Sequence, residues 1–293
     1  MWEILKTIVL GIVEGITEWL PISSTGHMIL VDEWMEMKAR PEFMDIFLVI
    51  IQLGAILAVL VLFWNKLWFF HTKNKIVKPF FKDNNGLKGF CNNYVHMDKL
   101  LLWVKILIAS IPAAILGIVF DDEIDSMLTG DKRAYVVAAT LILYGILFIV
   151  IENINKKVKI NDLSEMSYGT SFAIGLIQCL ALIPGTSRSG STILGATLLG
   201  TSRNTAAEFS FFLSVPAMVG GSAIKLLKFF IDGYRFTSYE IMILAIGCAV
   251  AFLVSVLAIK FLVSYTKRHD FKAFGYYRIA LGAFVLLYFI AIA

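Results

Sequence analysis

The chain has 293 residues, of which 58% are hydrophobic and 16% are charged, and its mean hydropathy is +0.78. Apolar segments this long and this frequent exclude an ordinary soluble domain and indicate an integral membrane protein. The net charge is +4, and we expect the membrane, but no nucleic acid, among its partners. The three cysteines, at positions 91, 179 and 248, have no paired spacing, so the sequence supports neither a disulfide framework nor a thiolate metal site.

The chain begins with an apolar segment, residues 7–31, that is broken in its middle by Pro21 and several small polar residues. Glutamates at positions 3, 14 and 18 interrupt the N-terminal part of the chain, so we expect no cleaved signal peptide. Three uninterrupted segments follow, then a second broken segment, residues 168–200 with Pro184, and then three more. The six uninterrupted segments are residues 46–64, 100–120, 134–151, 209–231, 239–263 and 276–293, each near the roughly 20 residues that cross a bilayer.

Each broken segment is long enough for two half-helices. Backbone that leaves helical geometry inside a bilayer must be covered by protein or water, because lipid cannot satisfy its N–H and C=O groups. We therefore predict two re-entrant helical hairpins. The basic residues support them, because the loops 65–99, 152–167, 201–208 and 264–275 contain 14 Lys and Arg, whereas the loops 32–45, 121–133 and 232–238 contain 5. The first set of loops is predicted to be cytoplasmic and the second set to lie outside. The loops alternate between the two sides in this way only if neither broken segment crosses the membrane.

The resulting fold class is an all-α polytopic membrane protein with an inverted repeat, formed by six full spans and two re-entrant hairpins. We expect a single integral membrane domain, residues 1–293, with one repeat over about 1–151, a second over about 168–293 and a cytoplasmic linker at 152–167. At an offset of 163, Pro21 aligns with Pro184 and Ser24 with Ser187. Inverted repeats commonly place broken helices around a site near the midplane, so we expect the two tips to meet there.

The first tip carries two carboxylates. Glu14 and Glu18 are four residues apart, so on a helix they share one face. Two carboxylates so close in a low dielectric repel unless a cation or a shared proton relieves them. Magnesium or calcium prefers oxygen ligands of this kind, so we predict a divalent cation bound by Glu14 and Glu18. The alternative is that both side chains only line an interhelical contact.

A short polar turn follows Pro21 and contains Ser23, Ser24, Thr25 and His27. Capping of the next half-helix explains one hydroxyl, but not three hydroxyls and a histidine. We therefore expect Ser23 and Thr25 to bind a ligand and Ser24 and His27 to take part in catalysis.

The second tip reads "PGTSRSGST", residues 184–192. Its glycines allow close approach of the backbone to a ligand, and the amides that begin the next half-helix favour an anion. Arg188 adds a planar charged fork suited to phosphate oxygens. The turn predicts an anion site formed by Ser187, Arg188, Ser189, Gly190 and Thr192. Alternatively, Arg188 neutralises Glu14 or Glu18 as a structural ion pair, which would also bring the tips together.

The motifs "EGITE", "PISSTGH" and "PGTSRSGST", together with the pattern of spans, resemble the undecaprenyl-diphosphate phosphatase family, the bacitracin-resistance membrane proteins of bacteria. The resemblance covers nearly the whole chain. It implies a plasma-membrane enzyme that hydrolyses undecaprenyl diphosphate to the monophosphate and so recycles the lipid carrier for cell-wall synthesis. The residues it carries over are Glu14, Glu18, Ser24, His27, Ser187, Arg188 and Thr192.

Phosphoryl transfer mainly requires positioning and neutralisation of charge, which the two tips can supply. We expect Ser24 to attack the phosphorus and His27 to act as its base. Water is an alternative nucleophile, and His27 itself is a less favoured one. A polyprenyl-phosphate transporter or flippase is the rival function, since it would also use inverted repeats and an anion site. The acidic loop "DEWMEMKARPE" follows the first hairpin, so we expect the site to open to the extracytoplasmic side. Small-residue runs such as "VGGSA" permit packing within or between chains, which leaves a homodimer open.

Overall fold

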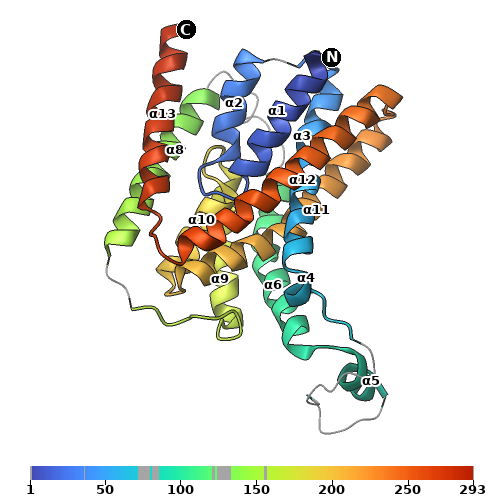
Figure 1. The fold of residues 1–293 in the computed structure, drawn as a ribbon, viewed down its shortest axis with the longest axis vertical. Coiled ribbons are helices and arrows are strands. Elements are labelled where there is room, and N and C mark those ends of the chain that lie inside the picture. The colour runs from blue at the N-terminus through green and yellow to red at the C-terminus, as the bar shows by residue number, and fades with distance from the viewer. Residues whose placement is uncertain are drawn as a thin grey trace.

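The computed structural model describes residues 2–35, 37–71, 80, 86–120, 123, 133–154 and 157–292. These residues form an all-α bundle (Figure 1), and six of its helices are long and apolar enough to cross a membrane. They are α3 (Pro41–Leu62), α6 (Met97–Val119), α8 (Arg133–Asn153), α11 (Arg203–Ile231), α12 (Ser238–Thr266) and α13 (Lys272–Ile292). Each coincides with one predicted span, so the prediction of a polytopic all-α protein with six spans is confirmed.

The two broken segments form pairs of shorter helices. The first pair is α1 (Trp2–Thr17) and α2 (Ser24–Trp34), and the second is α9 (Tyr168–Gln178), extended by the 3-10 turn η1 (Cys179–Leu182), and α10 (Arg188–Leu198). Each break contains the predicted proline. Proline interrupts a helix because it has no backbone N–H to donate and its ring clashes with the preceding turn. The re-entrant course of these pairs in a bilayer stays a prediction. Two further short helices, α4 (Trp64–Leu67) and α5 (Gly86–Tyr94), belong to the loop between α3 and α6.

The halves of the chain repeat one order of elements and pack in an equivalent way. In the first half α1 packs on α12, and in the second half α9 packs on α6. Helix α3 packs on α12 and α11, while α8 and α13 lie side by side along one flank of the bundle (Figure 1). The first short helix of each half therefore packs on the second long helix of the other half, which holds both breaks inside the bundle. The inverted orientation of the repeats across a membrane stays a prediction.

The alignment of the two tips differs by one residue from the one expected from sequence. Helices α2 and α10 both have 11 residues, and their N-caps are Ser23 and Ser187, which are 164 positions apart. The pairing of Ser24 with Ser187 was therefore wrong. Gly185, with φ of 84°, adds one residue between Pro184 and the cap, and this insertion shifts the register after the proline.

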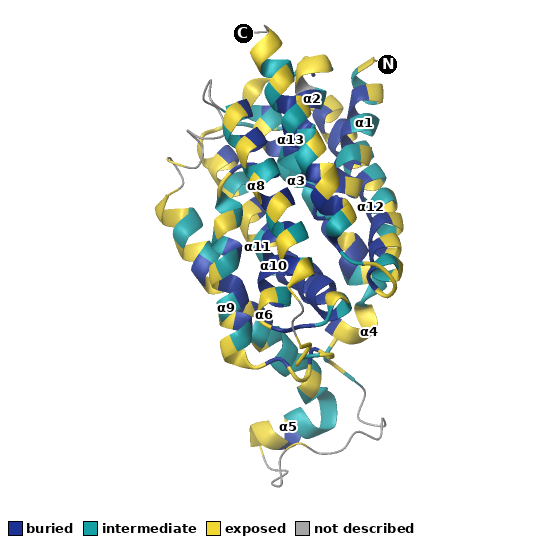
Figure 2. Cartoon of the chain, turned by 90° about the vertical axis from the view of Figure 1, so that its left-hand side faces the viewer, coloured by how far each residue is buried: buried dark blue, intermediate teal, exposed yellow. Residues whose placement is uncertain are grey.

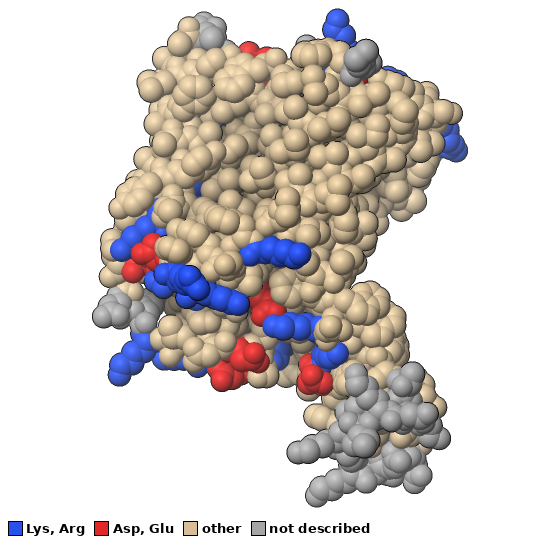
Figure 3. Space-filling model, viewed as in Figure 1, with Lys and Arg blue, Asp and Glu red and all other residues tan. Residues whose placement is uncertain are grey.

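The surface of the bundle is apolar around its middle. Leu257 on α12, Leu287 on α13 and Ile118 on α6 are each at least 66% exposed. In Figure 2 the exposed residues colour mainly the outward faces of the helices, and the buried residues colour mainly the faces between them. In Figure 3, Lys and Arg gather toward the lower part of the face shown, below a broad surface with few charges. An apolar belt beside a basic end is the surface that a bilayer requires.

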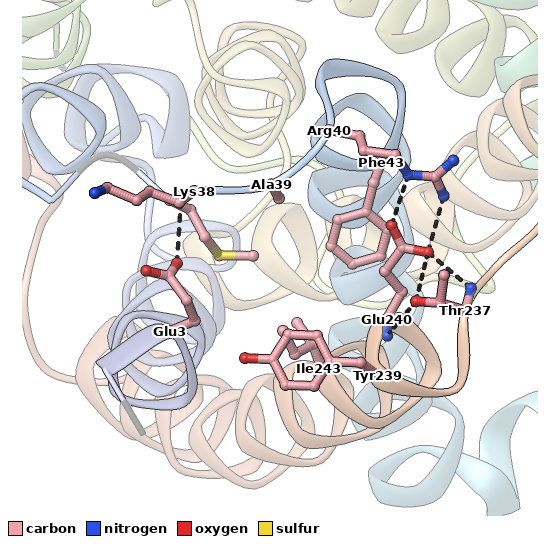
Figure 4. A pocket seen from close by; sticks show the side chains of 10 residues that line it. Glu3, Lys38, Ala39, Arg40, Phe43, Thr237, Tyr239, Glu240 and Ile243 are labelled. Carbon is pink, nitrogen blue, oxygen red and sulfur yellow. Dashed lines mark hydrogen bonds and ion pairs between the residues drawn. The ribbon is translucent and has the colours of Figure 1, made fainter.

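A cavity of about 610 Å³ lies where the N-terminal ends of α1, α3 and α12 meet, and its lining includes Glu3, Arg40 and Tyr239 (Figure 4). Arg40 donates from Nε and Nη2 to the two oxygens of Glu240, at 2.9 and 2.8 Å. Glu240 also completes a capping box with Thr237 at the start of α12. None of the predicted site residues lines this cavity.

Helices α3 and α12 approach so closely that only glycine fits at their crossing. A Cβ on Gly54 would lie 2.5 Å from the carbonyl oxygen and 2.6 Å from the Cα of Cys248, both backbone atoms. By contrast, no atom lies within 4 Å of a Cβ placed on Gly220 of α11.

We predict that Gly54→Ala destabilises the protein by about 1 to 3 kcal/mol, because the two helix backbones must separate. Gly220→Ala is the matched control and should be neutral or slightly stabilising, since alanine has the higher helix propensity. Thermal unfolding of both variants in detergent measures the difference. Equal midpoints for the two variants would refute the close crossing.

Candidate active site

The end of α1 places the two predicted carboxylates at the first tip. Glu14 and Glu18 are buried, with 2% and 8% of their surface exposed. The Oε1 atom of Glu14 has no hydrogen-bond partner within the described residues. A buried carboxylate oxygen without a partner is costly, so this atom marks a place where a cation or a donor from a ligand would be favoured.

Arg188, at the start of α10, joins the second tip to the first. Its Nη2 and Nε atoms donate to Oε1 of Glu18, at 2.9 and 3.3 Å, and Nη1 donates to the carbonyl oxygen of Ser210 at 2.9 Å. The two tips therefore meet as predicted, and they meet through the ion pair that is the alternative role for Arg188. The pair is largely buried, with 14% and 9% of the two side chains exposed.

Both tips have the same backbone conformation at the residue that caps the next helix. Ser23 and Ser187 have φ of 75° and 71°, and they are the only non-glycine residues with positive φ among those described. Each side chain accepts a hydrogen bond from a glycine amide, Gly26 N at 3.4 Å and Gly190 N at 3.1 Å. Such a conformation is strained for a residue with a side chain and persists only where the surroundings hold it.

The hydroxyls of the second tip are mostly bonded within the protein. Thr192, 1% exposed, shares a hydrogen bond with the hydroxyl of Ser210 and donates to the carbonyl of Arg188. The Ser189 hydroxyl lies 3.2 Å from that of Ser187 and 3.5 Å from the Leu20 carbonyl of the first tip. These contacts give the residues a role in shaping the turn, while their predicted contacts with a substrate stay predictions.

His27 lies on the first turn of α2 and is held at both ring nitrogens. Nδ1 lies 2.7 Å from the carbonyl oxygen of Ser23, which can only accept, so Nδ1 carries a proton. Nε2 lies 2.7 Å from the hydroxyl of Tyr277, and the two rings are stacked. Within the described residues no hydrogen bond joins His27 to Ser24, and both Ser24 and Thr25 are half-buried.

Two functional candidates on α13 were missed from sequence. Besides Tyr277, the next residue, Arg278, is 0% exposed and donates to carbonyl oxygens of both tips. The signal was available, because Arg278 is a charged residue inside the apolar segment 276–293, and a charge in a span indicates function by default. Tyr277 had no such signal, since a tyrosine near a membrane surface is common.

A groove of about 440 Å³ between α6, η1 and α11 has Arg188 on its lining. Helix α6 contributes Gly117 and Ile118, and η1 contributes Leu182. Helix α11 contributes small residues along the opposite wall, including Gly220 and Gly221. The groove is thus mainly apolar and has two cationic side chains, Arg188 and Lys225, on its lining, which suits an amphiphile with an apolar chain and an anionic head.

Comparisons with known proteins place the chain in a family. The family model for the bacitracin resistance protein BacA matches residues 7–284. The chain belongs to the BacA family. It is 56% identical to an undecaprenyl-diphosphatase of Enterococcus faecalis over 287 residues, which are 97% of this chain and 96% of that protein. It is 52% identical to an undecaprenyl-diphosphatase of Acetivibrio thermocellus over 294 residues, 100% of both chains, and 52% identical to undecaprenyl-diphosphatase 1 of Clostridioides difficile over 98% of this chain and 96% of that one.

In this BacA-family protein the described residues contain no group of three or more His, Cys, Asp or Glu side chains arranged for a metal ion. The predicted cation site therefore rests on Glu14 and Glu18 alone. The unpartnered oxygen of Glu14 is compatible with such a cation, whereas Glu18 is already paired with Arg188.

The strained cap at Ser187 gives a prediction that needs no assay of activity. Ser187→Ala removes the cap and keeps a side chain at positive φ, so it should cost about 1 kcal/mol. Ser187→Gly also removes the cap but relieves the backbone strain, so it should cost only a few tenths. Unfolding of the two variants in detergent, compared with the unchanged protein, measures the order. A glycine variant less stable than the alanine variant would contradict the strained conformation.

Proposed function

We propose that this BacA-family protein hydrolyses undecaprenyl diphosphate to undecaprenyl phosphate and inorganic phosphate in the bacterial plasma membrane. The observation that carries the proposal is the junction of the two tips, where Arg188 pairs with Glu18 beside the unpartnered carboxylate oxygen of Glu14. Relatives that match nearly the whole chain bear the name undecaprenyl-diphosphatase, which supports the same substrate. The product is the lipid carrier of cell-wall synthesis, so the activity would also account for bacitracin resistance.

The site would act by holding the diphosphate and neutralising its charge. Arg188, with the hydroxyls and amides of Ser187, Ser189 and Gly190 around it, would bind the phosphate oxygens. Attack on the terminal phosphorus forms one new P–O bond and breaks the bridging P–O bond, and undecaprenyl phosphate leaves. The Glu18 ion pair holds the guanidinium in one orientation before substrate arrives, so little reorganisation is needed during the reaction.

The attacking oxygen comes from Ser24 or from water. Ser24 lies at the start of α2, in the position that Arg188 has at the start of α10, and it is half-buried. His27 would take the proton at Nε2 once substrate displaces the Tyr277 hydroxyl, because Nδ1 is already protonated toward Ser23. Trapping of a phosphoserine at Ser24 distinguishes the covalent route from direct attack by water.

A divalent cation, magnesium or calcium, would be held by Glu14 and Glu18. Two carboxylates supply the oxygen ligands that these hard cations prefer, and one oxygen of Glu14 is without a partner among the described residues. Bound there, the cation would neutralise charge on the diphosphate. This role is compatible with an ion pair between Glu18 and Arg188, since each carboxylate has two oxygens and only Oε1 of Glu18 accepts from Arg188.

We further propose that the site opens to the extracytoplasmic side and receives the lipid from the side of the bundle. The groove that reaches Arg188 lies along the C-terminal parts of α6 and α11, toward the loops with few basic residues. The polyprenyl chain would lie against its apolar wall while the diphosphate reaches the tips. A homodimer stays a prediction, as does the orientation of both repeats in the membrane.

A polyprenyl-phosphate transporter is the less favoured function. It would need the anion site but not the added carboxylates and histidine, and the names of the relatives describe a phosphatase. Purified protein in detergent has no compartments, so release of phosphate there is expected only of the hydrolase.

We predict that Arg188→Lys lowers kcat for release of phosphate by about 100-fold while the positive charge remains. A lysine ammonium cannot bond Glu18 and the Ser210 carbonyl with the same planar fork, so the binding geometry is lost. Phosphate release by purified protein, normalised to the folded fraction, is the measurement. Arg235→Lys, at an exposed loop site, is the control and should keep normal turnover. Near-normal turnover by Arg188→Lys would remove Arg188 from the mechanism.

The cation site predicts a change in metal dependence. Glu14→Gln and Glu18→Gln each remove a charged ligand, so each should move the magnesium titration of turnover to concentrations at least about tenfold higher. Glu42→Gln, near the start of α3, is the control. Titration curves that coincide with that of the unchanged protein for both variants would refute the proposed cation ligands.

The proposed mouth can be tested by labelling. Thr25→Cys in a protein without Cys91, Cys179 and Cys248 should react with a membrane-impermeant thiol reagent added to intact cells, since Thr25 is only half-buried and belongs to the tip predicted to enter from the outer side. Lys88→Cys on α5 and Asp232→Cys after α11 calibrate the cytoplasmic and outer sides, because both positions are exposed. If the thiol of Thr25→Cys reacts only in inverted vesicles, as the thiol of Lys88→Cys is expected to do, the mouth lies on the cytoplasmic side.

A further inference from the structure

We infer that Arg278 is a positioning residue that locks the two tips together for the proposed reaction. The inference rests on the proposed function only for its effect on turnover. Helix α13, which carries Arg278, belongs to neither broken segment, and no motif of the tips includes it.

Arg278 bonds both tips at once. Its Nη1 atom donates to the carbonyl oxygen of Pro21 at 3.3 Å. Its Nη2 atom donates to the carbonyl oxygens of Gly185 and Thr186, at 2.8 and 3.0 Å. All three carbonyls lie within two residues of the strained caps Ser23 and Ser187. One rigid guanidinium thereby fixes the distance between two turns that are far apart in the sequence.

The charge of Arg278 has no carboxylate partner within the described residues. Its side chain is fully buried, its Nε atom lacks a hydrogen-bond partner, and the guanidinium carbon lies 5.5 Å from the centre of the Tyr144 ring. Three carbonyls and one aromatic face compensate a buried cation only partly. Packing alone does not explain the burial of so poorly compensated a charge. We therefore assign the Arg278 guanidinium to fixing the geometry of the two tips.

The geometry in question is that of the caps. Positive φ at Ser23 and Ser187 persists only if neighbouring contacts fix the turns, and Arg278 supplies such contacts to the residue two positions before Ser23 and to the two residues before Ser187. The fit is close, since a Cβ on Gly190 would lie 3.2 Å from Nη1 of Arg278. Loss of the guanidinium should therefore loosen both turns and shift Arg188 relative to Glu14 and Glu18.

The first arm of the test is kinetic. Arg278→Gln should lower kcat for phosphate release by about 100-fold, as expected for small misplacements of catalytic groups, and change KM by less than about threefold, because a fully buried side chain does not touch the substrate. Arg278→Lys, which keeps the charge and some donors, should lose less. Lys272→Gln, at the partly exposed start of the same helix, is the matched control. Turnover is normalised to the folded fraction from thermal unfolding.

The second arm needs no activity. In a protein without native cysteines, Leu20→Cys and Ser189→Cys place thiols on the two tips, where the Ser189 hydroxyl lies 3.5 Å from the Leu20 carbonyl. Oxidative cross-linking of this pair should be slowed several-fold by Arg278→Gln and unaffected by Lys272→Gln.

The outcomes separate the two proposals. A rise in KM equal to the fall in kcat, unchanged turnover per folded molecule, or unchanged cross-linking would each overturn the positioning role. If the unchanged protein releases no phosphate, the proposed function fails, and the cross-linking arm alone then decides the role of Arg278.

Discussion

The ion pair between Glu18 and Arg188 is the contact on which the arrangement of the tips depends. Each charge is buried, and a buried charge without its partner costs about 3 to 5 kcal/mol. Neither tip can therefore keep its own charge inside the bundle unless the other tip is in place. The packing of α1 on α12 and of α9 on α6 brings the breaks together, and the ion pair makes that packing mutually required.

The two repeats contribute opposite halves of one chemistry. In the register set by the caps Ser23 and Ser187, which applies after the breaks, Ser24 corresponds to Arg188 and His27 to Ser191. Glu14 lies before the first break and Gln178 before the second, and both side chains are buried. The Oε1 atom of each has no hydrogen-bond partner within the described residues. The first copy thus supplies the carboxylates and the histidine, and the second supplies the guanidinium. The proposed diphosphate site would therefore have both signs of charge only where the copies meet.

The spans and the breaks could be predicted because each depends on local composition, and the meeting of the tips could be predicted from the repeated order of elements. Proline and small polar residues at 21–27 and 184–192 identify the breaks whatever surrounds them. The exact register of the two tips could not be predicted, because it depends on one extra residue of positive φ, Gly185, whose effect appears only in the folded turn. The hydrogen bonds of Tyr277 and Arg278 could not be predicted either, since they join residues more than 90 positions apart through the packing of α13.

The packing around the tips leaves a groove along α6, η1 and α11, and this opening bears on mechanism. On the side of α1, α3 and α12, a Cβ on Gly54 would lie 2.5 Å from backbone, and one on Gly11 would lie 3.0 Å from the Gly247 carbonyl. On the side of α6, η1 and α11, a Cβ on Gly175 of α9 would clash with the Ala109 carbonyl of α6, whereas Gly220 and Gly221 face open space along the groove. A transporter must open two equivalent sides in turn, which here would require separating helices in backbone contact. A hydrolase needs one lateral opening to the tips, and the groove beside Arg188 supplies it while the closed side keeps the carboxylates in place.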